Sequence, residues 1–185
     1  MKPPGSPLLA HLERHLGPIQ TGWRLPGADS VFVVRFDDRP LEGAVTYTTV
    51  GLSETLLHQE DGGNLRQELL FCCWAPERDD DIVGLLMVVA GDVLQSEQAF
   101  AHGQVLGPAG PLVPDGNVEA LYCTAPVYFD DEFHAFRGVD PPVIIVWLVP
   151  LTRDEAAAAQ TDENFEDLLV EADPDFLDLS RESIL

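Results

Sequence analysis

Histidine and cysteine are the side chains of this sequence best suited to chemistry, and they are few. His11 and His15 are four residues apart, a spacing that places two imidazoles on one face of a helix and can hold a metal ion. No third ligand accompanies them, and motifs this short often occur by chance. We therefore interpret the pair as surface histidines, and we predict no metal and no other cofactor.

The three cysteines give little support to thiol chemistry. Cys72 and Cys73 are adjacent, so on a strand their side chains point to opposite faces and cannot bind one ion together. Cys123 would need a base, and His134 is the nearest candidate, but nothing in the sequence fixes that pair in space. All three are interpreted as small buried apolar residues. An odd number of cysteines also argues against a disulfide framework and favours a reducing, cytoplasmic compartment.

Clustered carboxylates can serve hydrolysis or metal binding, but 32 acidic residues make chance clusters unavoidable. The sequence holds no calcium-loop pattern, no glycine-rich phosphate loop and no serine nucleophile motif. It therefore predicts no catalytic residues and a protein that is not an enzyme.

The charge balance narrows the classes of partner. Against the 32 acids stand 10 basic residues in a chain of 185, which gives a formal net charge of −22. Such a surface repels phosphate backbones and anionic lipids, so we expect no nucleic-acid partner and no membrane partner. A basic protein remains, and the exposed acidic clusters are the candidate residues for binding it. These are Asp79, Asp80, Asp81, Asp130, Asp131, Glu132, Asp162, Glu163, Glu166 and Asp167.

The C-terminal end carries much of this charge. Between Thr152 and Leu185, eleven acids against two arginines leave a net charge of −9. One interpretation is a solvated helix face followed by an acidic tail over residues 173–185. A second interpretation is a docking surface whose charge raises the rate of association with a basic protein. A third possibility is that the acidity only keeps the protein soluble.

The elements that position these residues form an α/β (α+β) pattern. We predict one domain over residues 1–185, with a mixed β-sheet and helices packed on the sheet. Predicted strands span residues 31–36, 44–50, 67–74, 118–123 and 143–149. Predicted helices span residues 7–16, 79–100, 153–159 and 165–172.

Three details of this pattern can be checked directly. The run Val143–Val149 is apolar without alternation, so both of its faces should be covered, and Pro150 should end it. Gly84 and Gly91 each weaken the long helix by about 1 kcal/mol relative to alanine, so we expect them to allow close packing. The nine-residue run Ile82–Ala90 is the longest apolar stretch, too short for a membrane span, and the first residues hold no signal-peptide core.

The order of these segments resembles the suppressor-of-fused-like domain family. The strand and turn Tyr47–Ser53 are followed by Arg66–Leu69, a strand that ends at Trp74, and the apolar helix Ile82–Leu94. The glycine- and proline-rich stretch Gly107–Pro114, a strand leading to Ala125–Pro126, and the helix start Pro150–Glu155 complete the resemblance. Each motif is short, so their common order over Leu8 to Ala172 carries the comparison.

The resemblance implies a binding function. Members of this family act without catalysis through protein–protein contacts, and bacterial single-domain relatives are associated with polymorphic toxin systems as immunity proteins. The resemblance therefore implies a bacterial immunity protein that binds and neutralises a cognate toxin. The net negative charge favours a basic nuclease as that toxin. The alternative is a hydrolase or metal-dependent enzyme that uses clustered carboxylates and a histidine. The peptide cleft of the animal members needs a second domain that this sequence lacks, so their transcription-factor role is not carried over.

Overall fold

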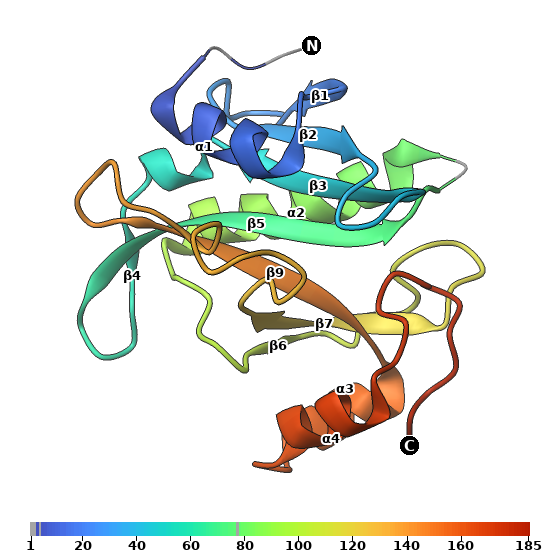
Figure 1. Cartoon of the computed structure of the whole chain (residues 1–185). Coiled ribbons are helices and arrows are strands. Elements are labelled where there is room, and N and C mark those ends of the chain that lie inside the picture. The colour runs from blue at the N-terminus through green and yellow to red at the C-terminus, as the bar shows by residue number, and fades with distance from the viewer. Residues whose placement is uncertain (1–2, 4, 77) are drawn as a thin grey trace.

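Nine strands build one mixed sheet within the described residues, which are 3, 5–76 and 78–185 of the computed structural model (Figure 1). The strands are β1 (Thr21–Arg24), β2 (Phe32–Asp37), β3 (Ala44–Val50), β4 (Leu57–His58), β5 (Asn64–Trp74), β6 (Val105–Leu106), β7 (Val118–Thr124), β8 (Ala135–Phe136) and β9 (Val143–Thr152). Their order is β1-β2-β3-β5-β9-β7-β6, with β4 paired to β5 and β8 to β9. Strands β5 and β9 are parallel, and the sheet is therefore mixed, as predicted.

Four α-helices and one 3-10 helix accompany the described sheet. They are α1 (Pro7–Leu16), η1 (Leu52–Glu54), α2 (Asp79–Ser96), α3 (Arg153–Ala159) and α4 (Phe165–Ala172). Helix α1 begins as predicted, because the Ser6 hydroxyl accepts from the Leu9 amide and Pro7 occupies the first turn. The predicted capping box also forms at α3, between Thr152 and Glu155.

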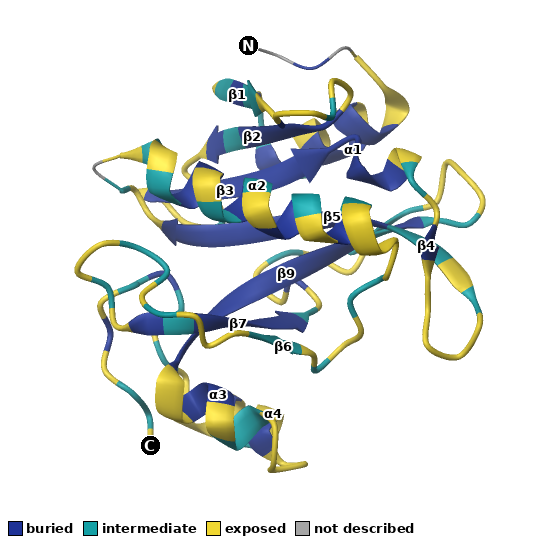
Figure 2. Cartoon of the chain, turned by 180° about the vertical axis from the view of Figure 1, so that it is seen from behind, coloured by how far each residue is buried: buried dark blue, intermediate teal, exposed yellow. Residues whose placement is uncertain are grey.

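The sheet separates two hydrophobic cores, and β9 contributes to both. Its Trp147 and Val149 pack on the face covered by α1, α3 and α4, while Val146 and Leu148 pack on the face covered by α2. Figure 2 shows the central strands buried along most of their length beneath α2. The prediction that both faces of this strand are covered is confirmed.

Some predicted boundaries are wrong. Strand β9 continues through Pro150, because its parallel pairing with β5 ends at Trp147 and the missing N–H breaks no bond there. Strand β1 lies outside the predicted strands, because its local signal is weak and its pairing with β2 forms it. The long helix ends at Ser96 rather than near Phe100, because Glu97 takes a left-handed conformation with φ of 54°.

Gly84 and Gly91 also differ from expectation. Gly84 is exposed, and a Cβ built at either glycine would meet nothing within 4 Å. Neither glycine allows close packing inside this chain, so that prediction is wrong. By contrast, Gly51 has a φ of +99°, and a Cβ there would lie 2.2 Å from the Ser30 carbonyl oxygen. Only glycine fits this close approach of two backbones.

The turn after β3 is held by a buried carboxylate. Glu68 on β5 accepts hydrogen bonds from the Thr49 hydroxyl at 2.6 Å, the Gly51 amide at 2.9 Å, and the Ser53 amide and hydroxyl at 3.1 and 2.7 Å. Its side chain is fully buried. One side chain on the neighbouring strand therefore holds the turn that follows β3.

Residues 173–185, here called the C-terminal strap, lie against the body of the domain. The Trp74 amide donates to the Leu177 carbonyl at 2.9 Å, and the Asn117 amide donates to the Leu179 carbonyl at 2.9 Å. Arg181 is buried and binds both oxygens of Glu155 on α3. In Figure 1 this segment is the dark red coil that leads to the C-terminus.

Of the N-terminal stretch expected to hold no targeting signal, Met1, Lys2 and Pro4 lie outside the described residues. Among the helices that the structure describes, none combines the length and apolarity needed to cross a membrane.

Candidate functional site

The thiols are placed for packing. Cys72, Cys73 and Cys123 are all unpaired and buried, and burial raises the pKa of each thiol to about 12. They are therefore protonated near neutral pH, and a protonated thiol is a poor nucleophile. Cys123 lies in the core beneath α2. The His134 ring contacts the Phe129 carbonyl, and Phe129 packs against the core on the other face of the sheet.

The two N-terminal histidines differ in exposure. His11 is buried and its Nε2 lies 3.2 Å from the Phe133 carbonyl oxygen, so its interpretation as a surface residue is wrong. The His15 ring lies near it, tilted by 57°, with ring centroids 5.0 Å apart. Burial, and then the charges of His11 and Arg14, lower the pKa of His15. No group of three His, Cys, Asp or Glu side chains that suits a metal ion occurs in the described part of the chain.

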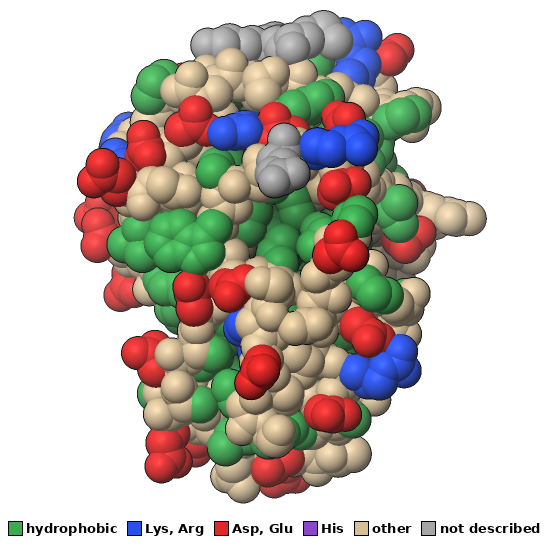
Figure 3. Space-filling model, turned by 90° about the vertical axis from the view of Figure 1, so that its right-hand side faces the viewer, with side chains coloured by type: hydrophobic (Ala, Val, Ile, Leu, Met, Phe, Trp, Pro, Cys, Tyr) green, Lys and Arg blue, Asp and Glu red, His purple; other side chains and the backbone are tan. Residues whose placement is uncertain are grey.

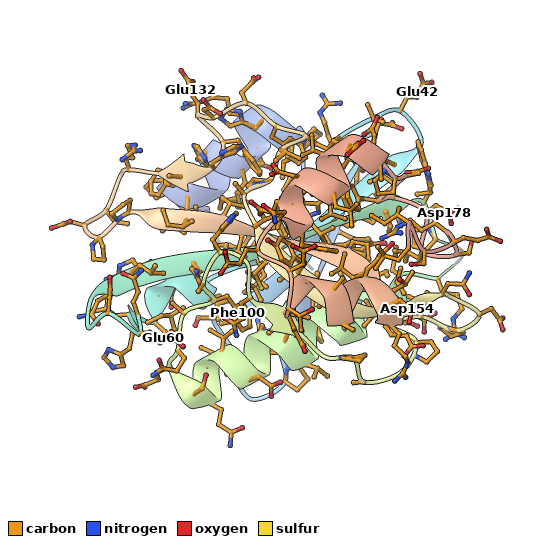
Figure 4. The ribbon with its side chains drawn as sticks, turned by 90° about the horizontal axis from the view of Figure 1, so that it is seen from below. Glu42, Glu60, Phe100, Glu132, Asp154 and Asp178 are labelled. Atoms are coloured by element: carbon orange, nitrogen blue, oxygen red, sulfur yellow. The ribbon has the colours of Figure 1, made fainter. Side chains whose placement is uncertain are left out.

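The predicted acidic clusters lie in three separate places. Asp79, Asp80 and Asp81 occupy the first turn of α2; Asp130, Asp131 and Glu132 lie in the loop before β8; Asp162, Glu163, Glu166 and Asp167 surround the start of α4. Figure 4 shows acidic side chains at well-separated edges of the molecule, with Glu132, Glu42 and Glu60 at three of them. The face in Figure 3 likewise carries scattered acidic side chains with apolar areas between them.

Asp79 and Glu166 are among the acids that are already engaged within the chain. Asp79 accepts from the Tyr47 hydroxyl at 2.5 Å and from Arg35, and so it fixes α2 to the sheet. Glu166 accepts from the Tyr122 hydroxyl at 2.9 Å, and His102 Nε2 lies 2.9 Å from the same oxygen. Most of the remaining predicted acids are exposed.

One acidic cluster borders an apolar groove of about 440 Å³, which we call the Trp147 groove. It opens between α4 and the loop after β7. Its walls come from the sheet, this loop, α4 and the C-terminal strap: His102, Tyr122, Thr124, Ala125, Val127, Tyr128, Trp147, Val149, Glu166, Leu169, Val170, Asp173 and Phe176.

The groove presents large apolar side chains to solvent. Val170 on α4 is 79% exposed, and Val127 in the loop after β7 is 67% exposed. Isolated exposed apolar residues are ordinary, but a contiguous set around a groove is typical of binding surfaces. Within the floor, the Trp147 indole N–H is buried and has no hydrogen-bond acceptor among the described residues. Buried donors without acceptors are uncommon in folded proteins.

Two carboxylates border the groove, and the two tyrosine hydroxyls in its wall stay protonated. Glu166 and Asp173 border the opening. Burial, followed by the charge of Asp175, raises the pKa of the Tyr128 hydroxyl to about 12. Burial and the hydrogen bond to Glu166 also raise the pKa of Tyr122. The arrangement can bury an apolar side chain while its carboxylates face a nearby cation.

Sequence reasoning found Glu166 but missed the apolar walls. Val170 gave one readable signal, because it stands among acids on the outward face of α4, where a polar residue is expected. The positions of Val127, Tyr128 and Trp147 gave none, since the groove forms only where β7, β9 and α4 meet.

These features define a mixed α+β domain with a surface suited to contact with another protein. Residues 27–182 match the family model described as Suppressor of fused protein (SUFU), and the chain belongs to that family. The resemblance drawn from the order of motifs is thereby confirmed.

The chain is similar to one relative in sequence and to two solved structures in fold. The immunity protein YqcF of Bacillus subtilis (strain 168) is 23% identical over 161 residues, which cover 84% of this chain and 82% of that protein. The crystal structure of a putative SUFU homologue from Neisseria gonorrhoeae FA 1090 matches with a TM-score of 0.76 at 19% identity, covering 96% of this chain and 94% of that one. A chain of the Sufu–Fu complex matches with a TM-score of 0.69 at 15% identity, covering 95% and 88%.

Drosophila Suppressor of Fused is a longer relative. It matches with a TM-score of 0.62 at 15% identity over 82% of this chain, and this chain spans 42% of its length. Only part of that protein is therefore comparable with the domain described here.

Proposed function

We propose that this chain is a non-catalytic immunity protein that binds and neutralises a cognate toxin in the cytoplasm, and that the Trp147 groove belongs to its binding surface. The observation that carries the proposal is an apolar groove with an acidic rim on a chain of net charge −22. A basic protein with an exposed apolar side chain complements both features. The relative named immunity protein YqcF supports the same class of function.

The negative charge of the chain affects the rate at which it associates with its partner. Long-range attraction between an acidic surface and a basic domain raises the association rate, while burial of apolar side chains slows dissociation. A toxin that binds nucleic acid carries a basic surface, so it is the partner class that this charge favours. Binding should weaken as ionic strength rises, whereas acidity that serves solubility alone predicts no complex.

Val170→Glu tests the groove. Val170 is 79% exposed, so the variant should fold with a free energy of unfolding within about 0.5 kcal/mol of the wild type. Its carboxylate would enter the apolar opening and is expected to weaken binding to the cognate toxin by about tenfold or more. Calorimetric titration of the purified proteins measures the affinity, and rescue of growth on co-expression measures neutralisation.

Leu41→Glu is the matched control, because Leu41 is 52% exposed and lies outside the groove. It should bind and rescue like the wild type. If the wild-type protein neither forms a complex nor rescues growth, the immunity function is wrong. If the complex forms and Val170→Glu binds with unchanged affinity, the function stands and the assignment of the groove fails.

A further inference from the structure

The outer side of α2 is a second apolar surface, on the opposite face of the sheet from the Trp147 groove. A shallow groove of about 530 Å³ runs between α2 and the turn Leu25–Ala28. We call it the α2 groove. Its lining holds no charged residue and consists of Leu25, Pro26, Gly27, Ala28, Met87, Val88, Gly91, Leu94 and Gln95. Figure 2 shows the exposed stripe of α2 facing the viewer.

The sequence of α2 does not fit a helix with one solvated face. From Ile82 to Gly91 it contains no charged residue, although this stretch includes outward positions. Val88, which lines the groove, is 64% exposed. A helix of ordinary surface type carries polar side chains on its outer face. The outer face of α2 is instead apolar and, among the described residues, uncovered.

The two glycines add a separate observation. Glycine is the least favourable helix residue after proline, and neither Gly84 nor Gly91 is needed for packing, since a Cβ at either position meets nothing within 4 Å. What the missing side chains provide is access to the helix backbone from outside. Small residues at such positions let a second helix approach closely.

The charge at the C-terminal end of α2 specifies the occupant. Asp92 and Glu97 are exposed there, the last turn has no basic residue, and the helix C-terminus itself carries partial negative charge. The N-terminal end is closer to balance, because Arg78 lies 3.6 Å from Asp80 and Arg35 binds Asp79. The C-terminal end is therefore where a partner's cation is favoured.

A second copy of this chain fits poorly. If two α2 helices packed in parallel, Asp92 and Glu97 of one copy would face the same residues of the other. If they packed antiparallel, these acids would face the three aspartates of the first turn, which outnumber the nearby arginines. Both arrangements place like charges together, so a partner of opposite charge fits better.

We propose that the α2 groove binds an apolar helical segment of a partner protein, with a lysine or arginine placed over the C-terminal end of α2. The rise of a helix puts Asp92 and Glu97 about 6 and 14 Å along the axis from Val88, which sets the distance between the partner's apolar centre and its cation. This surface goes beyond the proposed function, which concerns the other face of the sheet.

The test uses a synthetic helical peptide with an alanine and leucine seam and lysines in its last turn, and a second peptide with glutamates in place of the lysines. Fluorescence anisotropy measures binding of each peptide to the full chain. We expect the lysine peptide to bind, the glutamate peptide to bind at least about tenfold more weakly, and Val88→Glu to abolish binding. Leu41→Glu, which is exposed elsewhere, should bind like the wild type.

Gly91→Ala separates docking from a structural role. The added methyl group meets open space in the chain, so the thermal midpoint should rise by about 2–4 °C, while the affinity for the lysine peptide falls because the backbones can no longer meet. The proposal is overturned if the lysine peptide does not bind, if both peptides bind equally, or if Val88→Glu or Gly91→Ala leaves the affinity unchanged. A dimer in sedimentation velocity that Val88→Glu dissociates would also overturn it, because the occupant would then be a second copy.

Discussion

Replacing Glu68 with leucine is expected to lower the free energy of unfolding by about 4–6 kcal/mol. The substitution removes the acceptor of four hydrogen bonds, those from Thr49 Oγ1, the Gly51 amide, and the amide and hydroxyl of Ser53. Each buried donor left without an acceptor costs about 1–3 kcal/mol, and leucine supplies none. Urea denaturation followed by circular dichroism measures the loss.

Glu68→Gln is the matched comparison. Three of the four donors bond Oε1, which glutamine retains, and only Thr49 donates to Oε2. The glutamine amide would face the Thr49 hydroxyl, which already accepts from the Leu69 amide and would lose its own acceptor. The expected loss is therefore about 1–2 kcal/mol. Equal losses for the leucine and glutamine variants would show that the carboxylate does not organise this turn.

The difference in free energy of unfolding between the wild type and Glu68→Gln should depend on pH. Burial raises the pKa of Glu68 above the ordinary 4.5, although the bonds from Thr49, Ser53 and Gly51 oppose the shift. A carboxyl whose pKa is higher in the folded state contributes stability that is complete below pH 4.5 and is lost as the pH rises through the folded value. The wild type should therefore gain stability relative to Glu68→Gln as the pH falls toward 4.5.

Arg181→Met is expected to cost about 3–5 kcal/mol, because it leaves the Glu155 carboxylate buried without its counter-charge. Both contacts are 2.6 Å long, the side chains of Arg181 and Glu155 are 6% and 0% exposed, and Arg181 also donates to the Pro150 carbonyl. Methionine preserves much of the packing of the aliphatic stem but loses the guanidinium that lies over the Phe176 ring. Thermal and urea unfolding measure the cost.

The control is the double variant Arg181→Met with Glu155→Gln, which removes both charges. It should be more stable than Arg181→Met alone, because no unpaired charge stays buried. If the two proteins are equally stable, the loss comes from packing and the ion pair contributes little.

The pH dependence at this pair has the opposite sign to that at Glu68. Burial alone would raise the pKa of Glu155, but hydrogen bonds from Arg181 and from the Thr152 and Ile184 amides lower it on balance. A lowered pKa gives stability that is present above pH 4.5 and is lost as the pH falls through the folded value. The difference between wild type and Arg181→Met should therefore shrink in acid.

The sequence predicted the elements better than the site. Apolar runs and caps located α1, α2 and β9, because these signals are local. The capping box at Glu155 was also readable, but its partner Arg181 lies 26 residues further along, and no local pattern joins them.

The acidic residues could be chosen by type, and most are indeed exposed, but their types do not show which border an apolar surface. The Trp147 groove needs strand pairing and the return of α4 before its walls meet. The cost of Gly84 and Gly91 to the helix predicts close packing within the chain, but a Cβ at either position would meet nothing within 4 Å.

The C-terminal strap has a consequence for binding. Its Asp173 and Phe176 line the Trp147 groove, and Phe176 packs edge-on against Trp147 with ring centroids 5.8 Å apart. Opening of the strap and occupancy of the groove are therefore linked equilibria, since opening removes one wall of the groove. The free energy of partner binding therefore adds to that of the Arg181 ion pair in keeping the strap closed. Hydrogen exchange of the Trp74 amide, which donates to Leu177, measures strap opening with and without the partner.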